Sequence, residues 1–144
     1  MPLENFGSIL NFAEELENQD RQFYAVAAGN PDCVECQVLF GELESDAERN
    51  MKTVQRIRRE NVTEMILEPV TDFVRGSFCE ACEGAGQMTA AQALETATRL
   101  EARADRYYFE AAEKLKSLTE VARALQTLGK NHKTHIAKLM NAKR

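Results

Sequence analysis

The chain has few prolines, no long apolar run and no excess of basic residues, and each of these absences excludes a class of protein. It contains only three prolines, which suits a mostly helical protein. No stretch approaches the length of a membrane-spanning helix, and the first residues lack the basic start and apolar run of a signal peptide. The net charge of −5 disfavours a general nucleic-acid binder, which would need a basic face. We therefore expect one soluble, cytoplasmic domain over residues 1–144, without a nucleic-acid or membrane partner.

What the chain does contain is helical periodicity in four segments. Apolar residues recur at steps of three and four, which places them on one face of a helix. We predict an all-α protein with helices over about residues 6–28, 32–59 and 89–116, and from about 117 onward. The last three helices open with the residue pairs of a reciprocal cap, namely Asp32 with Glu35, Thr89 with Gln92, and Ser117 with Glu120.

The connections between these helices predict how they are arranged. The first two helices and the last two are separated by only a few residues, so each pair should form an antiparallel hairpin. The segment between the pairs, about residues 60–87, is far longer than a turn and can cross the length of a bundle. These lengths predict a four-helix bundle of two hairpins joined by a long crossover.

An internal repeat links the two hairpins and places acidic residues in their core. Glu17 and Tyr24 recur as Glu101 and Tyr108 at the same spacing, within matching apolar stripes. A glutamate inside an apolar stripe is costly to desolvate unless its charge is paired. Two of them in equivalent positions indicate a shared partner, and we interpret that partner as a metal ion. We expect both tyrosines to pack in the core with hydroxyls on neighbouring carboxylates, and Asp20 to lie at a solvated edge.

The order, spacing and duplication of these pieces resemble the ferritin-like superfamily, closest to the rubrerythrin-type di-iron domain. The matching pieces are Glu17–Tyr24, Leu39–Leu43, Glu101–Tyr108 and Leu128–His135. The resemblance implies a ferritin-like four-helix bundle, two bound irons, and peroxidase or ferroxidase chemistry. It also allows a homodimer that pairs through the outer faces of the helices.

The chain departs from that family at the residues that would bridge two irons. Such bundles take a Glu-x-x-His pair from each of two helices. Here Ala47 and Asn50 replace one pair. In the other pair His132 replaces the glutamate and His135 is kept, and these two are the only histidines of the chain. Because a bridging carboxylate shares two oxygens and an imidazole offers one nitrogen, we expect a mononuclear iron or zinc site. The expected ligands are Glu17, Glu101, His132 and His135. The rival interpretation is that the histidines are core residues paired with the glutamates, without a metal.

All four cysteines fall in two Cys-x-x-Cys pairs, Cys33 with Cys36 and Cys79 with Cys82. In a reducing cytoplasm such cysteines are metal ligands or redox groups more often than structural disulfides. A crossover that traverses the bundle would bring both pairs to one end, where they could share a zinc ion, or an iron acting as a one-electron centre. The alternatives are two redox dithiols, with Cys33 favoured as a thiolate by the helix N-terminus, or unconnected free thiols.

Two classes of function remain open from the sequence. The first is a metalloprotein with a core iron or zinc site and a thiolate zinc site, whose partners are metal ions. Oxidoreductase chemistry, and with it an electron-transfer partner, is implied by the resemblance alone, so whether the protein is an enzyme stays open. The second is a non-catalytic redox or metal sensor, or an interaction module that uses its Cys-x-x-Cys dithiols. A bundle without any metal would make the histidine and cysteine spacings coincidental.

Overall fold

The computed structural model describes residues 5–61, 73, 75–79 and 84–142, and within these residues it is all-helical. The long helices are α1 (Phe6–Ala28), α2 (Gln37–Glu60), α3 (Ala90–Lys114) and α4 (Thr119–Ala142). Short 3-10 helices lie between them, namely η1 (Pro31–Cys36), η3 (Arg75–Phe78) and η4 (Ala85–Gln87). The all-α prediction is confirmed for this part of the chain. None of the helices described is long and apolar enough to cross a membrane.

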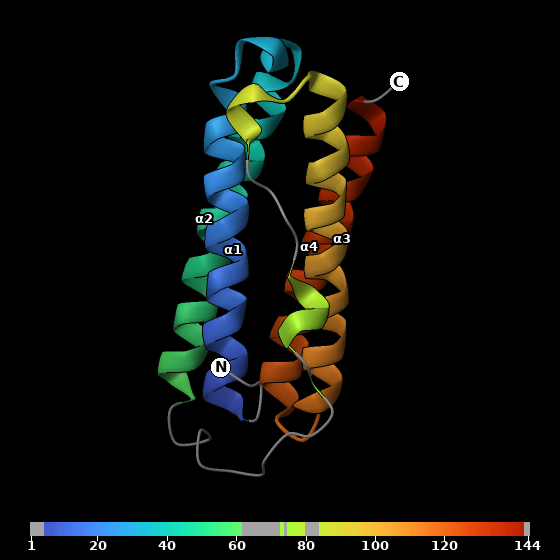
Figure 1. Cartoon of the computed structure of the whole chain (residues 1–144). Coiled ribbons are helices and arrows are strands. Elements are labelled where there is room, and N and C mark those ends of the chain that lie inside the picture. The colour runs from blue at the N-terminus through green and yellow to red at the C-terminus, as the bar shows by residue number, and fades with distance from the viewer. Residues whose placement is uncertain (1–4, 62–72, 74, 80–83, 143–144) are drawn as a thin grey trace.

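The four α-helices stand side by side (Figure 1). In that view α1 rises from the lower end and α2 descends, whereas α3 descends from the upper end and α4 rises. The most extensive contacts between long helices are those of α1 with α2 and of α3 with α4. η3 lies at an intermediate height and η4 at the upper end, so the chain between α2 and α3 joins opposite ends of the molecule.

The beginning of α2 differs from the predicted cap at Asp32 and Glu35. A 3-10 helix occupies that stretch, and α2 begins only at Gln37. The reason lies in the residues around the turn. The Asn30 side chain accepts a hydrogen bond from the Asp32 backbone N–H, and Cys33 has non-helical backbone angles (φ −110°, ψ 21°). The cap predicted at Asp32 is therefore wrong, because Asn30 caps the short helix η1, which precedes α2.

Asn30 also fastens η1 to the chain that leads into α3. Its Nδ2 donates to the carbonyl oxygens of Ala85 and Met88, at 2.8 Å in each case. α3 then begins as predicted, because the Thr89 side chain accepts from the Gln92 N–H and the Gln92 side chain accepts from the Thr89 N–H. This reciprocal cap determines where α3 begins.

The core consists of two apolar clusters separated by buried polar residues. The lower cluster includes Phe12 and Tyr107, and the upper cluster includes Phe23 and Phe40. Each long helix runs from one cluster to the other and contributes polar side chains between them. We call these side chains the polar layer. Its members are Glu17 and Asp20 on α1, Asn50 on α2, Glu101 and Arg103 on α3, and His132 and His135 on α4.

Candidate metal centre

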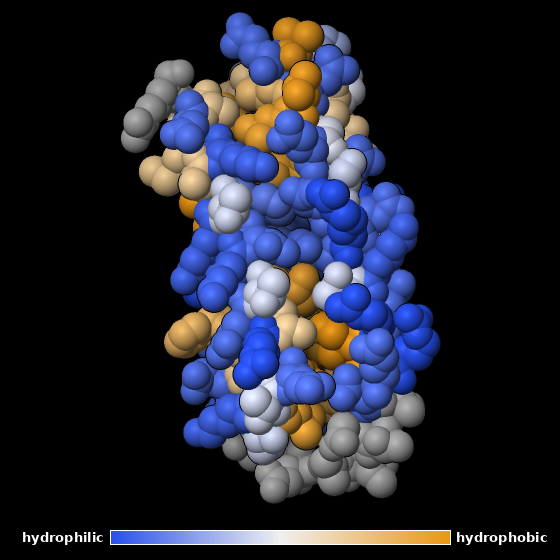
Figure 2. Space-filling view, turned by 180° about the vertical axis from the view of Figure 1, so that it is seen from behind, coloured by the Kyte–Doolittle hydropathy of each residue, from blue (hydrophilic) through white to orange (hydrophobic). Residues whose placement is uncertain are grey.

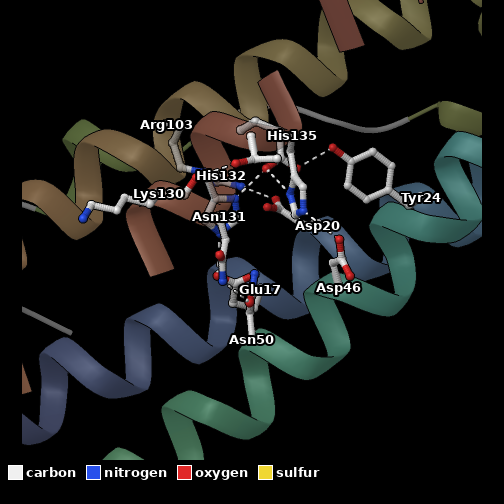
Figure 3. Close-up of polar contacts among 12 residues, drawn as sticks. Glu17, Asp20, Tyr24, Asp46, Asn50, Arg103, Lys130, Asn131, His132 and His135 are labelled. Carbon is white, nitrogen blue, oxygen red and sulfur yellow. Dashed lines mark hydrogen bonds and ion pairs between the residues drawn. The ribbon is translucent and has the colours of Figure 1, made fainter. Parts of the chain in front are cut away.

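The polar layer holds charged groups in the most enclosed part of the molecule. Glu17 and Asp20 are 0% exposed, Glu101 and His132 are 1% exposed, and His135 is 4% exposed. Figure 3 shows how the side chains of this layer converge from the surrounding helices. Burying charged groups is unfavourable unless each one is paired. The contacts among these groups therefore determine what the layer can do.

Each histidine turns its two ring nitrogens toward different carboxylates. His132 Nδ1 lies 2.5 Å from Glu101 Oε1, and its Nε2 lies 2.7 Å from Glu17 Oε2. His135 Nδ1 lies 3.0 Å from the same Glu101 oxygen, and its Nε2 lies 2.9 Å from Asp46 Oδ2. Both Nδ1 atoms therefore face Glu101, while the Nε2 atoms face Glu17 and Asp46.

This geometry fits a metal ion bound by Glu101, His132 and His135. One ligand atom from each of these residues lies within 4.8 Å of the others, and all three residues are buried. Histidines that bind metals usually donate their second N–H to a carboxylate or carbonyl, which fixes the tautomer and the ring orientation. Asp46 and Glu17 are placed to accept those protons, which leaves both Nδ1 lone pairs for an ion. Two imidazoles and one carboxylate suit zinc or Fe(II).

Glu17 belongs to a second group of candidate ligands. Glu17, Asp20 and His132 also bring ligand atoms within 4.8 Å of one another, and all three are buried. The four residues expected in the core site thus fall into two groups that share His132. Because the two nitrogens of an imidazole point away from each other, one ion cannot use both. The structure in this way separates Glu17 from the group of Glu101 and His135.

Two tyrosines donate hydrogen bonds across the sequence repeat. Tyr24 on α1 donates to Glu101 Oε2 at 2.6 Å, and Tyr108 on α3 donates to Glu17 Oε2 at 2.5 Å. The Tyr108 ring also stacks on His132, with ring centroids 5.5 Å apart. Both tyrosines therefore pack in the core with their hydroxyls on carboxylates, as expected. Each tyrosine donates to the glutamate of the other half of the repeat.

Charge pairing determines the protonation of the layer. Burial by itself lowers the pKa of His132, but the carboxylates of Glu17 and Glu101 raise it well above its ordinary value. Burial raises the pKa of Glu101, and the contacts with His132 and His135 outweigh this and lower it to about 2. Without an ion, His132 is therefore an imidazolium held between two carboxylates. A metal ion at its Nδ1 would have to displace a proton.

Asp20 is buried, so the expectation of a solvated edge is wrong. Arg103 reaches it from α3, with Nη2 2.8 Å from Asp20 Oδ1, and both side chains are 0% exposed. Arg103 Nη1 also donates to Gln19 Oε1 at 3.0 Å and to the Phe78 carbonyl oxygen at 3.1 Å. In contrast, Asp20 Oδ2 has no hydrogen-bond partner among the described residues.

Asp46 and Arg103 are the residues of the site that the sequence analysis missed. Asp46 precedes Asn50 by four residues and so lies near the same face of α2, a spacing that could have revealed it. Arg103 falls two residues after Glu101, off the spacing of three and four that defines the apolar stripe. Its role depends on the approach of α3 to Asp20 on α1, which no pattern within one helix expresses.

The structure describes three of the four cysteines and does not bring these three together. Cys33 and Cys36 are buried in the upper apolar cluster. Cys79 is exposed and follows η3, which lies well below η1 in Figure 1. Cys82 lies outside the described residues, and no candidate ligand group found among the others contains a cysteine. Burial raises the pKa of Cys33, so the expected stabilisation of its thiolate is not found. The shared thiolate site stays a prediction.

A polar cavity opens beside His135, between α2 and α4. It has a volume of about 390 Å³. The face seen in Figure 2, on the side of α2 and α4, is mostly hydrophilic. The walls of the cavity are formed by Asp46, Arg49, Asn50, Thr53, Asn131, Thr134, His135 and Lys138. Ions and small polar molecules can therefore approach His135 from this side.

Comparisons of the chain with known protein families, with curated proteins and with solved structures each find no match. The resemblance to ferritin-like proteins therefore rests on the residues and on their spacing along the chain.

Proposed function

We propose that the chain is a metal-binding protein of the ferritin-like, rubrerythrin-type class, built from the hairpins α1–α2 and α3–α4. The opposite directions of neighbouring helices in Figure 1 support two antiparallel hairpins joined by a crossover. The repeat of Glu17 and Tyr24 as Glu101 and Tyr108 supports the equivalence of the hairpins. The placement of acids and histidines between two apolar clusters supports a site at the centre of the bundle.

The proposed ligands of one divalent zinc or iron ion are Glu101, His132 and His135. The observation that carries the proposal is the orientation of the two rings. Both Nδ1 atoms face Glu101 Oε1, at 2.5 and 3.0 Å, and both Nε2 atoms are held by other carboxylates. Two ring nitrogens that face one carboxylate oxygen bring three ligand atoms around one point, and this is the arrangement that a shared ion needs.

Charge balance favours one divalent ion. The polar layer buries the three carboxylates of Glu17, Asp20 and Glu101 and the one guanidinium of Arg103. With neutral histidines and all three carboxyl groups ionised, two negative charges remain in a place where unpaired charge is costly. One divalent ion would neutralise them. In the absence of the ion, protonation of the histidines supplies the balancing charge.

The residues do not fit the carboxylate-bridged two-iron centre of the family. Ala47 has no ligand atom. Asn50 donates from Nδ2 to Glu17 Oε1 at 3.3 Å and accepts from Asn131 Nδ2 at 3.4 Å. Asn50 therefore positions Glu17 and is the member of the polar layer on α2 that also lines the cavity. The proposal is for this reason a mononuclear site at Glu101.

The chemistry depends on which metal is bound. Zinc would supply a Lewis acid or a structural link, and iron would supply a one-electron centre. The protein's own groups orient the ligands: Asp46 and Glu17 hold the two rings, and Tyr24 donates to the free oxygen of Glu101. The cavity beside His135 would admit small polar molecules. Oxidoreductase chemistry with iron is the proposal if the protein is an enzyme, in agreement with the resemblance.

A non-catalytic metal sensor is the second candidate function. The contacts without an ion favour it, since all four ring nitrogens of His132 and His135 lie within 3.0 Å of a carboxylate oxygen. The bundle can therefore keep its packing with and without the ion, as a sensor must. In a redox sensor the buried thiols of Cys33 and Cys36 would be the reacting groups.

Metal analysis of protein purified without added metal tests the proposal. We expect one zinc or iron per chain besides any metal held by the cysteines. Glu101→Gln should lose this ion, whereas Glu110→Gln, an exposed position on the same helix, should retain it. Circular dichroism shows whether each variant is still helical. Wild-type protein that contains no such ion and takes up neither zinc nor Fe(II) on dialysis would overturn the proposal.

A further inference from the structure

We infer that a second cation site lies on the opposite edge of His132, formed by Glu17 and Asp20 together with His132 Nε2. The inference rests on the proposed function, because the first ion would hold His132 through Nδ1. The second ion would replace the proton that lies between His132 Nε2 and Glu17, and this proton would leave to solvent. The imidazole would then link two ions, of which one is bound by Glu101 and the other by Glu17, the two repeated glutamates.

The residues of this second site already face one another. His132 Nε2 lies 2.7 Å from Glu17 Oε2, and one ligand atom from each of Glu17, Asp20 and His132 lies within 4.8 Å of the others. Glu17 and Asp20 are three residues apart on α1, so their carboxylates project from the same side of the helix. Figure 3 shows the three labelled side chains in the same part of the polar layer.

An unused oxygen of Asp20 supports a cation at this position. Asp20 is 0% exposed, and its Oδ1 accepts from Arg103 Nη2 at 2.8 Å. Its Oδ2 has no hydrogen-bond partner among the residues that the structure describes. A buried carboxylate oxygen without a donor is unfavourable, and most such atoms in proteins are satisfied. A cation between Glu17 and Asp20 would satisfy this oxygen.

Arg103 determines the order in which the two ions bind. Its charge lies beside Asp20 and balances one of the three buried carboxylates before any metal is bound. The first divalent ion neutralises the layer, so the second adds positive charge, offset in part by the loss of the His132 proton. We therefore expect the second ion to bind more weakly than the first. One imidazole nitrogen and two carboxylates suit a divalent first-row transition ion.

Titration of the metal-depleted protein with cobalt(II) tests the inference. The absorption of cobalt separates nitrogen and oxygen surroundings from thiolate surroundings, so ions at the cysteines are counted apart. We expect two cobalt ions per chain in nitrogen–oxygen surroundings, and a weaker paramagnetic resonance signal per cobalt once both are bound, because the imidazolate couples their spins. Asp20→Asn should bind one such ion. Asp32→Asn, an exposed aspartate, should still bind two.

The outcomes distinguish this inference from the proposed function. One uncoupled cobalt per wild-type chain would overturn the second site and leave the first intact, whereas none in nitrogen–oxygen surroundings would overturn the proposed function itself. Asp20→Asn leaves Arg103 buried without its charge partner, so the double variant Asp20→Asn/Arg103→Gln accompanies it. Loss of one cobalt in the double variant supports the second site. Binding of two cobalt ions by either folded variant contradicts it.

Discussion

Asp46 does not bind the proposed ion, yet at the scale of single residues it decides which nitrogen of His135 is free to do so. Its Oδ2 lies 2.9 Å from His135 Nε2. An ion pair with Arg49 on the same helix holds Asp46 in place. A carboxylate in this position fixes the tautomer of the ring and raises its basicity. His135 is therefore prepared for a metal by a residue of another helix.

Replacing Asp46 by asparagine should weaken metal binding by about 10- to 100-fold, because the ring loses the negatively charged acceptor that orients it and raises its basicity. Competition between the protein and a chelator for zinc measures the affinity. Glu48→Gln, at an exposed position two residues away on α2, is the control and should bind as the wild type does. Equal affinities for Asp46→Asn and wild type would show that Asp46 does not position His135.

The buried pair of Arg103 and Asp20 gives a second prediction for single residues. Arg103→Gln should lower the free energy of unfolding by about 3–5 kcal/mol, because Asp20 is left as a buried charge without a partner. Adding Asp20→Asn should recover part of the loss. Urea unfolding measures both variants. The control is Arg99→Gln, from an exposed pair with Glu95 on the same helix, where we expect a change of about 1 kcal/mol or less. A loss for Arg103→Gln no larger than that of the control would contradict the prediction.

At the scale of elements, η1 and η4 connect the two helix pairs at the upper end. Asn30 caps η1 and donates to the carbonyl oxygens of Ala85 and Met88 before α3 begins. The buried Sγ of Cys33 lies 4.0 Å from the Met88 carbonyl oxygen. One of the two Cys-x-x-Cys pairs therefore lies where the two helix pairs meet. Hydrogen bonds of Asn30 already make this connection without a metal.

Asn30→Ala should lower the free energy of unfolding by about 1–3 kcal/mol, because two carbonyl groups lose their donor. Urea unfolding of metal-depleted protein gives the difference, without a contribution from any ion at the cysteines. Asn141→Ala, at the exposed end of α4, is the control and should leave the stability almost unchanged. If the two variants were equally stable, water would be an adequate substitute for the Asn30 side chain.

At the scale of the whole molecule, the polar layer makes stability depend on pH. Two apolar clusters pack above and below it, so every long helix passes through the same set of charges. Glu101 and His132 hold their charges in the fold more firmly than in the unfolded chain, because each is paired with the other. A change in either charge should therefore change the free energy of unfolding of the whole bundle.

Without metal, the pair of Glu101 and His132 should stabilise the fold most between about pH 4.5 and 6.5. Folding lowers the pKa of Glu101 from 4.5 to about 2, so its contribution is complete above pH 4.5 and is lost as the pH falls toward 2. Folding raises the pKa of His132 above 6.5, so its contribution is complete below pH 6.5 and is lost as the pH rises through the raised value. Urea unfolding across this range, in the presence of a chelator, measures both limbs.

Added zinc should prevent the loss of stability above pH 6.5. Zinc binds histidines that have lost a proton, so its apparent affinity rises with pH. The zinc-loaded protein serves as the comparison in the same unfolding series. If the stability of the metal-depleted protein did not decline above pH 6.5, the assignment of His132 as an imidazolium would be contradicted.

Much of this structure could be predicted from local patterns. The four helices and the cap at Thr89 follow from residues within a few positions of one another, and helical geometry turns such spacings into faces. The same geometry placed Glu17, Glu101, His132 and His135 on buried faces. It could not find Arg103 or the burial of Asp20, because both depend on how close α1 and α3 approach each other.

The sequence by itself therefore determined the helices, their order and the residues with metal-binding chemistry, since these follow from periodicity along the chain and from side-chain type. Only the tertiary structure decided which nitrogen meets which carboxylate. It placed the Nδ1 atoms of both histidines against Glu101. The Nε2 atom of His132 contacts Glu17, and that of His135 contacts Asp46. Those contacts combine side chains from four different helices, and the packing of the helices, rather than the spacing within any one of them, sets such distances.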